Sequence, residues 1–201
     1  MPKPYCIGLV GRIGTGKSAA LNIFKSLNIP IISADEINRT LLKPGKAAYQ
    51  AIVNKSQEEV LNQDKTLNTQ LLREKMLADP NYKAFLEALL HPLVRQEIKA
   101  QIKVLSPDFP FCIIEIPLII NKNDYPYLNK ILCIACDQTL QLKRILQRKN
   151  MTLAIANKLI NMQASQEEYL AIADDVIENN SSLQNLKNKV LKLHAKYTQN
   201  P

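Results

Sequence analysis

Gly11-Arg12-Ile13-Gly14-Thr15-Gly16-Lys17-Ser18 is the stretch near the N-terminus that decides the fold. It satisfies the pattern G-x-x-x-x-G-K-[ST] at every position. The short apolar run Tyr5–Val10 precedes it, and the segment Lys17–Leu27, which has helical periodicity, follows it. A strand, a glycine-rich turn and a helix in this order predict a loop that binds phosphate groups.

Each position of this loop has a physical role. Glycines let successive backbone N–H groups point toward phosphate oxygens, and the helix that follows aims its positive end at the same anion. Lys17 would place a cation at the β- and γ-phosphates, and the Ser18 hydroxyl is a candidate ligand of Mg²⁺. We therefore expect ATP and Mg²⁺ as cofactors. The predicted nucleotide-binding residues are Gly11, Arg12, Ile13, Gly14, Thr15, Gly16, Lys17, Ser18, Ala19 and Arg148.

The remaining apolar runs of strand length predict an α/β fold. They are Ile29–Ile32, Phe111–Ile116, Ile131–Ala135 and Val176–Ile177. Continuous apolar strands that alternate with helices indicate a parallel sheet with helices on both faces. The block Lys46–Leu105 has helical periodicity without a strand, apart from the polar stretch Asn54–Thr69, which we expect to form a loop. It therefore predicts a helical insertion in the sheet.

Composition limits the choice of partners. The chain has 201 residues and a net charge of +8, which suits an anionic partner, either nucleic acid or a polyphosphate. The lysines near the C-terminus alternate with apolar residues at helical spacing and are interpreted as a solvated helix face. No apolar run is long enough to span a membrane. We expect a cytoplasmic protein, monomeric or weakly homo-oligomeric, without nucleic-acid or membrane partners.

Four cysteines lie in apolar, strand-like segments: Cys6, Cys112, Cys133 and Cys136. The last two form a C-x-x-C, a spacing that also occurs in metal and redox sites. Side chains three apart on a strand point to opposite faces, and no second pair or nearby histidine completes a zinc site. We interpret all four as core residues.

A loop that binds a triphosphate does not identify the reaction. A GTPase is one alternative, because Asn121-Lys122-Asn123-Asp124 carries the letters of the guanine-binding motif. No Asp-x-x-Gly sequence lies between the phosphate loop and this string, which counts against that class. A small-molecule kinase needs a carboxylate beside the acceptor hydroxyl and cations around the transferred group.

The chain offers both groups. Asp35 follows the second predicted strand, so it should face the crevice of the phosphate loop and could act as a general base. It could also cap the following helix, and the two roles are compatible. Arg144 and Arg148 are four residues apart in a predicted helix, Thr139–Arg148, so they should share one face and could close over the triphosphate. Asp35, Lys17 and Arg144 are the predicted catalytic residues.

Six motifs in order resemble the dephospho-CoA kinase family across nearly the whole chain. They are the phosphate loop, Ile32-Ser33-Ala34-Asp35 with Arg39, Leu89-Leu90-His91-Pro92, Glu115-Ile116-Pro117-Leu118-Ile119, the lid-like group Gln141, Arg144, Arg148 and Gln163, and Ala173-Asp174-Asp175-Val176-Ile177-Glu178-Asn179. Departures from the family pattern are Arg12 and Ser33, which stand in place of glycine and aspartate, and Thr69 and Asn121, where Arg and Glu are common. Arg12 adds a cation that could meet phosphate.

The resemblance implies transfer of the ATP γ-phosphoryl group to the ribose 3′-hydroxyl of dephospho-CoA. It implies one P-loop kinase domain over residues 1–201, with a core at about 1–44, 106–136 and 173–201, a helical CoA-binding region at about 45–105 and a helical lid at about 137–165. The substrate-binding residues it implies are Asp35, Arg39, Arg73, His91, Pro117 and Leu118. For His91, substrate contact and a structural role at a helix start before Pro92 both stay open. A nucleoside or nucleotide kinase and a non-catalytic ATP-binding regulator remain the alternatives.

Overall fold

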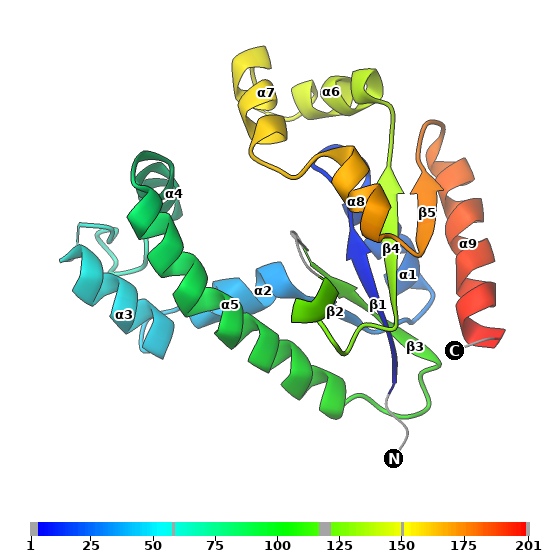
Figure 1. Cartoon of the computed structure of the whole chain (residues 1–201), viewed down its shortest axis with the longest axis horizontal. Coiled ribbons are helices and arrows are strands. Elements are labelled where there is room, and N and C mark those ends of the chain that lie inside the picture. The colour runs from blue at the N-terminus through cyan, green and yellow to red at the C-terminus, as the bar shows by residue number, and fades with distance from the viewer. Residues whose placement is uncertain (1–3, 58, 117–121, 150, 200–201) are drawn as a thin grey trace. The chain divides into compact units, whose positions relative to one another are not determined.

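Five short strands form one parallel sheet in the order β2-β3-β1-β4-β5 (Figure 1). They are β1 (Tyr5–Val10), β2 (Ile31–Ser33), β3 (Phe111–Glu115), β4 (Lys130–Ala135) and β5 (Asp175–Glu178). β1 lies between β3 and β4, and the chain leaves it toward β2 on one side and returns to β4 on the other. The loop that follows β1 therefore sits where the strand order reverses, the usual ligand position in such sheets. The predicted parallel α/β fold is confirmed.

The structure is a computed structural model that describes residues 4–57, 59–116, 122–149 and 151–199. The chain divides into two compact units, residues 1–33 with 102–201, and residues 34–101, each of which is described by itself. The first unit contains the sheet and the second is helical. No helix in the described ranges has an apolar stretch long enough to cross a membrane.

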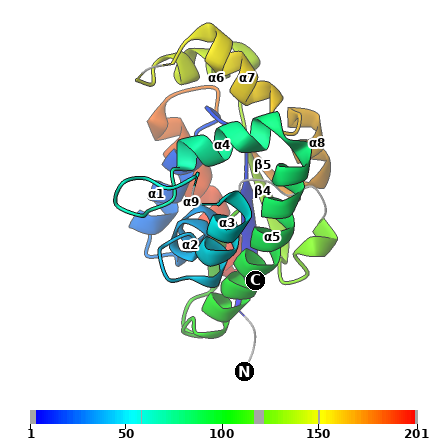
Figure 2. The ribbon, with the colours of Figure 1, turned by 90° about the vertical axis from the view of Figure 1, so that its left-hand side faces the viewer.

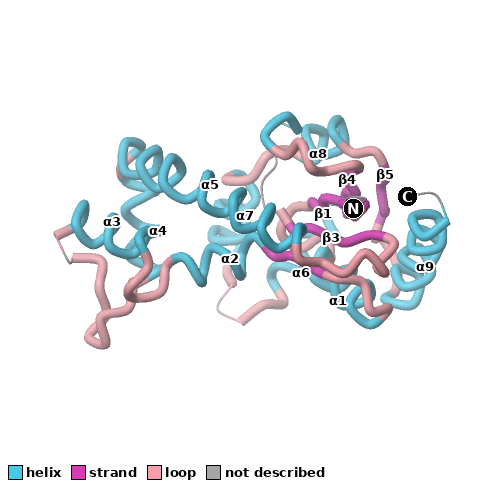
Figure 3. Tube along the Cα trace, turned by 90° about the horizontal axis from the view of Figure 1, so that it is seen from below, coloured by secondary structure: helices cyan, strands magenta, loops and turns pink. Residues whose placement is uncertain are grey.

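Helices cover both faces of the sheet (Figure 3). Ile7 and Leu9 of β1 face a buried core that includes Phe24 of α1 (Lys17–Ser26) and Val190 of α9 (Leu183–Gln199). α8 (Gln166–Ile172) packs on β4 from the other side, where Tyr169 is buried close to Cys133. Alternating side chains of one strand thus pack into two different layers, as the continuous apolar runs predict.

Two short helices, α6 (Gln138–Leu146) and α7 (Leu153–Asn161), lie side by side after β4 (Figure 2). They bury a small cluster of Ile145, Ala156 and Ile160 between them. The predicted helix ends at Arg148, whereas α6 ends at Leu146. Arg148 therefore lies beyond the helix, and the expectation that it shares a helix face with Arg144 is wrong.

The helical unit contains α2 (Ala34–Leu41), α3 (Ala47–Ser56), α4 (Thr69–Ala78) and most of α5 (Pro80–Lys103). Its core includes Tyr49, Ile52, Val60, Leu72, Tyr82 and Leu86. The predicted loop over Asn54–Thr69 is confirmed at residues 57 and 59–68, whereas residues 54–56 belong to α3 and Thr69 begins α4. The side chain of Asn68 ends this loop by accepting hydrogen bonds from the first amides of α4.

His91 and Pro92 lie in the interior of α5, which runs through them without a break. The expected structural role of His91 at a helix start is therefore wrong. Pro80, rather than Pro92, occupies the first position of the helix, where a missing N–H costs nothing. The side chain of His91 is exposed.

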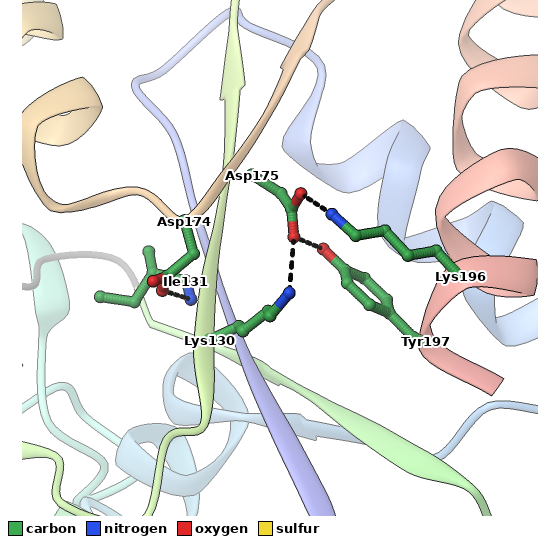
Figure 4. A network of polar contacts seen from close by, with 6 residues as sticks. All are labelled: Lys130, Ile131, Asp174, Asp175, Lys196 and Tyr197. Carbon is green, nitrogen blue, oxygen red and sulfur yellow. Dashed lines mark hydrogen bonds and ion pairs between the residues drawn. The ribbon is translucent and has the colours of Figure 1, made fainter. Parts of the chain in front are cut away.

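The element Ala173–Asn179 ties the edge strand into the sheet. Asp174 accepts a hydrogen bond from the Ile131 amide at 2.8 Å, and Asp175 accepts one from the Tyr197 hydroxyl at 2.9 Å (Figure 4). Lys196 also pairs with Asp175, and Lys189 donates to the Glu178 carbonyl. Two lysines of the C-terminal helix thus anchor α9 to β5. The 3₁₀ turn η1 (Lys122–Asp124) covers the described part of the Asn-Lys-Asn-Asp string.

Candidate active site

The phosphate loop has backbone conformations that only glycine adopts without strain. Gly14 and Gly16 have φ of +83° and +98°. A Cβ on Gly16 would lie 2.2 Å from the Asn179 amide nitrogen, and one on Gly14 would lie 2.8 Å from a side-chain carbon of Ile145. Both glycines are thus required by the local backbone and by close neighbours.

The inner half of the loop, residues 14–19, has backbone N–H groups without hydrogen-bond partners in the described part of the chain. The N–H groups of Gly14, Gly16, Lys17, Ser18 and Ala19 have no acceptor within the described part of the chain. Gly16 caps α1 without a side-chain hydrogen bond, so the positive end of the helix is open. These amides and the helix end form a site suited to a polyphosphate.

Glu115, the last residue of β3, contacts two side chains at once. One is Lys17 at the start of α1, and the other is Ser33 at the end of β2. The Lys17 ammonium lies 2.6 Å from Glu115 Oε1, and the Ser33 hydroxyl donates to Glu115 Oε2 at 2.7 Å. The Lys17 and Glu115 side chains are only 15% and 13% exposed, which strengthens their attraction. Glu115 thus holds the loop lysine at the sheet edge where phosphate would bind.

The outer half of the loop, Arg12 and Ile13, contacts α6, α7 and the residues that follow α7. Gln163 accepts from the Ile13 amide, and Gln141 donates to the Ile13 carbonyl, both at 2.7 Å. The Arg12 guanidinium donates to the Ile160 carbonyl of α7 at 2.8 Å. These contacts join α6 and the end of α7 to the loop.

Thr15 of the phosphate loop contacts two distant segments, α6 through Arg144 and the segment after β5 through Asn179. Its carbonyl accepts a hydrogen bond from Asn179 at 2.8 Å and a longer one from Arg144 at 3.4 Å. Its hydroxyl donates to the Arg12 carbonyl, and the residue is 1% exposed. Arg144 therefore lies beside the loop, as predicted, whereas Arg148 is exposed and only its backbone amide bonds, to Ile145.

The cysteines are buried free thiols, which confirms their assignment to the core. Burial raises the pKa of Cys133 to about 11 and also raises the pKa of Cys136. The residues with a described position contain no group of three His, Cys, Asp or Glu side chains that could hold a metal.

Four of the six predicted substrate-binding residues lie in the helical unit. Asp35 is the second residue of α2, two positions after the last residue of β2, and is exposed. Arg39 lies one helical turn later, and Arg73 of α4 is exposed, as is His91. Pro117 and Leu118 lie outside the described residues.

Sequence reasoning assigned no role to Glu115, Gln141, Gln163 or Asn179, although each falls within a motif of the resemblance. Glu115 could have been found, because a charged residue that ends an otherwise apolar strand is unusual and such strand ends line the ligand crevice. The other three are amide side chains on segments far from the loop in the sequence. No local pattern indicates that they contact it.

Comparison with known proteins agrees with this arrangement. The family model for dephospho-CoA kinase matches residues 5–185. The dephospho-CoA kinase of Legionella pneumophila (strain Philadelphia 1) is 38% identical over 193 residues, which are 96% of this chain and 95% of that protein. Residues 5–185 include the phosphate loop, Glu115, Arg144 and Asn179.

Two solved structures have a similar fold over nearly the whole chain. A crystal structure from Thermus thermophilus superposes with a TM-score of 0.83 at 25% identity and covers 97% of this chain and 98% of that chain. The dephospho-CoA kinase from Campylobacter jejuni superposes with a TM-score of 0.72 at 28% identity and covers 96% and 97%. With a family model that spans most of its length and a relative at 38% identity over 96% of the chain, this chain belongs to the dephospho-CoA kinase family.

Proposed function

We propose that this protein transfers the γ-phosphoryl group of ATP to the ribose 3′-hydroxyl of dephospho-CoA, giving coenzyme A and ADP. The observation that carries the proposal is the phosphate loop, in which five backbone amides have no acceptor in the described part of the chain and Lys17 stands at the start of α1. Family membership favours this acceptor over a nucleoside and over a regulator without catalysis.

Donor binding rests on the inner half of the loop. The amides of Gly14 and of Gly16 to Ala19 would bind the β- and γ-phosphate oxygens, and Lys17 would exchange its contact with Glu115 for one with phosphate. A Mg²⁺ ion bound to the Ser18 hydroxyl would neutralise charge on the phosphates. The exposed Ser18 fits such an ion, which takes its other ligands from phosphate oxygens and water.

Acceptor activation is assigned to Asp35. Its carboxylate would accept the proton of the 3′-hydroxyl as the hydroxyl oxygen attacks the γ-phosphorus and the bond to the ADP oxygen breaks. Arg39, Arg73 and His91 are candidates to bind the anionic substrate from the helical unit. Arg144 and Lys17 would stabilise charge on the transferred group.

A coupled ADP-release assay tests the reaction. Dephospho-CoA should support turnover and a panel of nucleosides and nucleotides should not, and phosphorus NMR should show a new 3′-phosphomonoester in the product. Asp35→Asn should lower kcat by about 100-fold or more and leave ATP affinity nearly unchanged, since a general base contributes about 10²–10⁴.

Asp108→Asn is the matched control, because Asp108 is an exposed carboxylate that bonds only within its own loop. ATP binding without acceptor-dependent ADP release would contradict the proposed reaction. Full turnover by Asp35→Asn would contradict only the assignment of the base.

A further inference from the structure

Arg12 stands inside the phosphate loop, yet its side chain points away from the unpaired amides and toward the lid. Its Nη2 donates to the Ile160 carbonyl in the last turn of α7 at 2.8 Å. A cation at the C-terminal end of a helix is favourable, because the exposed carbonyls there carry partial negative charge. The guanidinium therefore binds α7 through both a hydrogen bond and charge.

A second contact lies on the neighbouring residue. The Ile13 amide donates to Gln163, two residues beyond the end of α7, and the Ile13 side chain packs on the cluster that α6 and α7 share. The loop is thus divided. The Arg12 side chain and the Ile13 amide bond to the end of α7 and to Gln163, whereas the N–H groups of Gly14 and of Gly16 to Ala19 have no acceptor in the described part of the chain.

The bond to α7 leaves the Nε donor of Arg12, which is buried, without a partner in the described part of the molecule. A buried N–H without a partner is unfavourable, so a movement of α7 that supplies a second acceptor would be favoured. Glu167 in the first turn of α8 is a carboxylate close enough to Arg12 to interact with its charge. Hydrogen bonds within that turn lower the pKa of Glu167, and the positive charge of Arg12 adds to that effect.

We propose that Arg12 is a lid-positioning residue, which fixes the end of α7 to the outer half of the phosphate loop and so couples the lid to bound nucleotide. This rests on the proposed kinase function for its catalytic consequence. The contact itself exists in the free protein. In this role Arg12 affects transfer and water exclusion through α7 and does not itself contact phosphate.

Hydrogen exchange of the nucleotide-free protein tests the contact directly. Arg12→Gly places in this position the residue that the loop pattern of the family carries, and the backbone there does not need an unusual conformation. Amides of α7 should exchange about tenfold faster in this variant, as expected for loss of a charged hydrogen bond. Amides of α9 should not change. Arg12→Lys should restore part of the protection.

Steady-state kinetics separate positioning from phosphate binding. Arg12→Gly should lower kcat about three- to tenfold and raise acceptor-free ATP hydrolysis, while the Kd for ATP changes less than about twofold. Lys158→Ala is the control, because Lys158 is an exposed cation on α7 that no described side chain pairs with. It should leave all of these quantities unchanged.

Two outcomes would overturn the proposal. Unchanged exchange of α7 in nucleotide-free Arg12→Gly would show that the contact does not hold the helix. A large rise in the Kd for ATP with unchanged α7 exchange would show that Arg12 binds phosphate. Failure of the wild-type protein to phosphorylate dephospho-CoA would contradict the proposed function and leave the exchange experiment interpretable.

Discussion

The Lys17 ammonium lies 2.6 Å from Glu115, and the second carboxylate oxygen of Glu115 accepts a hydrogen bond from Ser33. The loop cation is thus neutralised by a carboxylate on the adjacent strand before any nucleotide binds. ATP must compete with Glu115 for Lys17, and the same carboxylate repels the incoming phosphates. Glu115 should therefore weaken ATP binding and at the same time hold Lys17 in position for transfer.

The variant Glu115→Gln tests whether Glu115 weakens ATP binding while it positions Lys17. We expect metal-free ATP to bind roughly fivefold more tightly at low salt, because one negative charge near the phosphates is removed. We expect kcat to fall about tenfold, because Lys17 loses its oriented partner. Isothermal titration calorimetry and steady-state kinetics measure the two effects. Ser33→Ala, which removes only the hydrogen bond to Glu115, should show little gain in affinity, and weaker ATP binding by Glu115→Gln would contradict the argument.

Gly16→Ala should abolish ATP binding. Its φ of +98° is strained for alanine, and the new Cβ would displace Asn179 from the Thr15 carbonyl. Gly45→Ala is a matched control, because Gly45 also has a positive φ, +84°, but has nothing within 4 Å of the added Cβ. The control should lose only about 1 kcal/mol of stability and retain full affinity. Equal losses of affinity in the two variants would contradict the structural reason.

Arg144→Ala and Arg148→Ala should differ, since only Arg144 reaches the loop. We expect Arg144→Ala to lower kcat about 100-fold or more, as loss of a cation from the transferred phosphoryl group does. Arg148→Ala should cost less than about fivefold, as expected for an exposed charge. Single-turnover kinetics at saturating ATP would separate these effects from binding. A larger effect at Arg148 would indicate that the lid rearranges to bring it to the phosphates.

Asp175→Asn should destabilise the fold in a pH-dependent way. Burial opposes the charge of Asp175, but hydrogen bonds from Lys196 and Tyr197 and the nearby Lys130 outweigh it, so its pKa is lowered (Figure 4). A lowered folded-state pKa gives stability that is present above the unfolded value, about 3.8, and is lost as the pH falls through the folded pKa.

Urea unfolding at two pH values measures this effect. At pH 7 we expect Asp175→Asn to cost about 1–3 kcal/mol, the range for hydrogen bonds with charged groups. Near pH 3 the difference from the wild type should shrink, because the Asp175 carboxylate of the unfolded wild type is then largely protonated and the folded state gains less from its charge. Asp108→Asn, on an exposed loop before β3, should cost little at either pH. An equal loss for Asp175→Asn at both pH values would exclude charge as the cause.

Local sequence was enough to predict the elements that carry the site. The strand, loop and helix around Gly11–Ser18 form where the pattern places them, because glycine conformations and apolar periodicity act within a few residues. Helix ends were less certain. The periodicity around Arg144 and Arg148 continues past Leu146, but the helix does not.

The sequence by itself determined the phosphate loop, the parallel sheet and the family, because each depends on residues that are adjacent in the chain or on motifs that keep their order. Only the tertiary structure decided which distant side chains hold the loop. Glu115, Gln141, Gln163 and Asn179 each contact it from segments about 100 residues or more away. Strand order and helix packing create those contacts, so Arg12, which looked like a cation for phosphate, is found bonded to the end of α7.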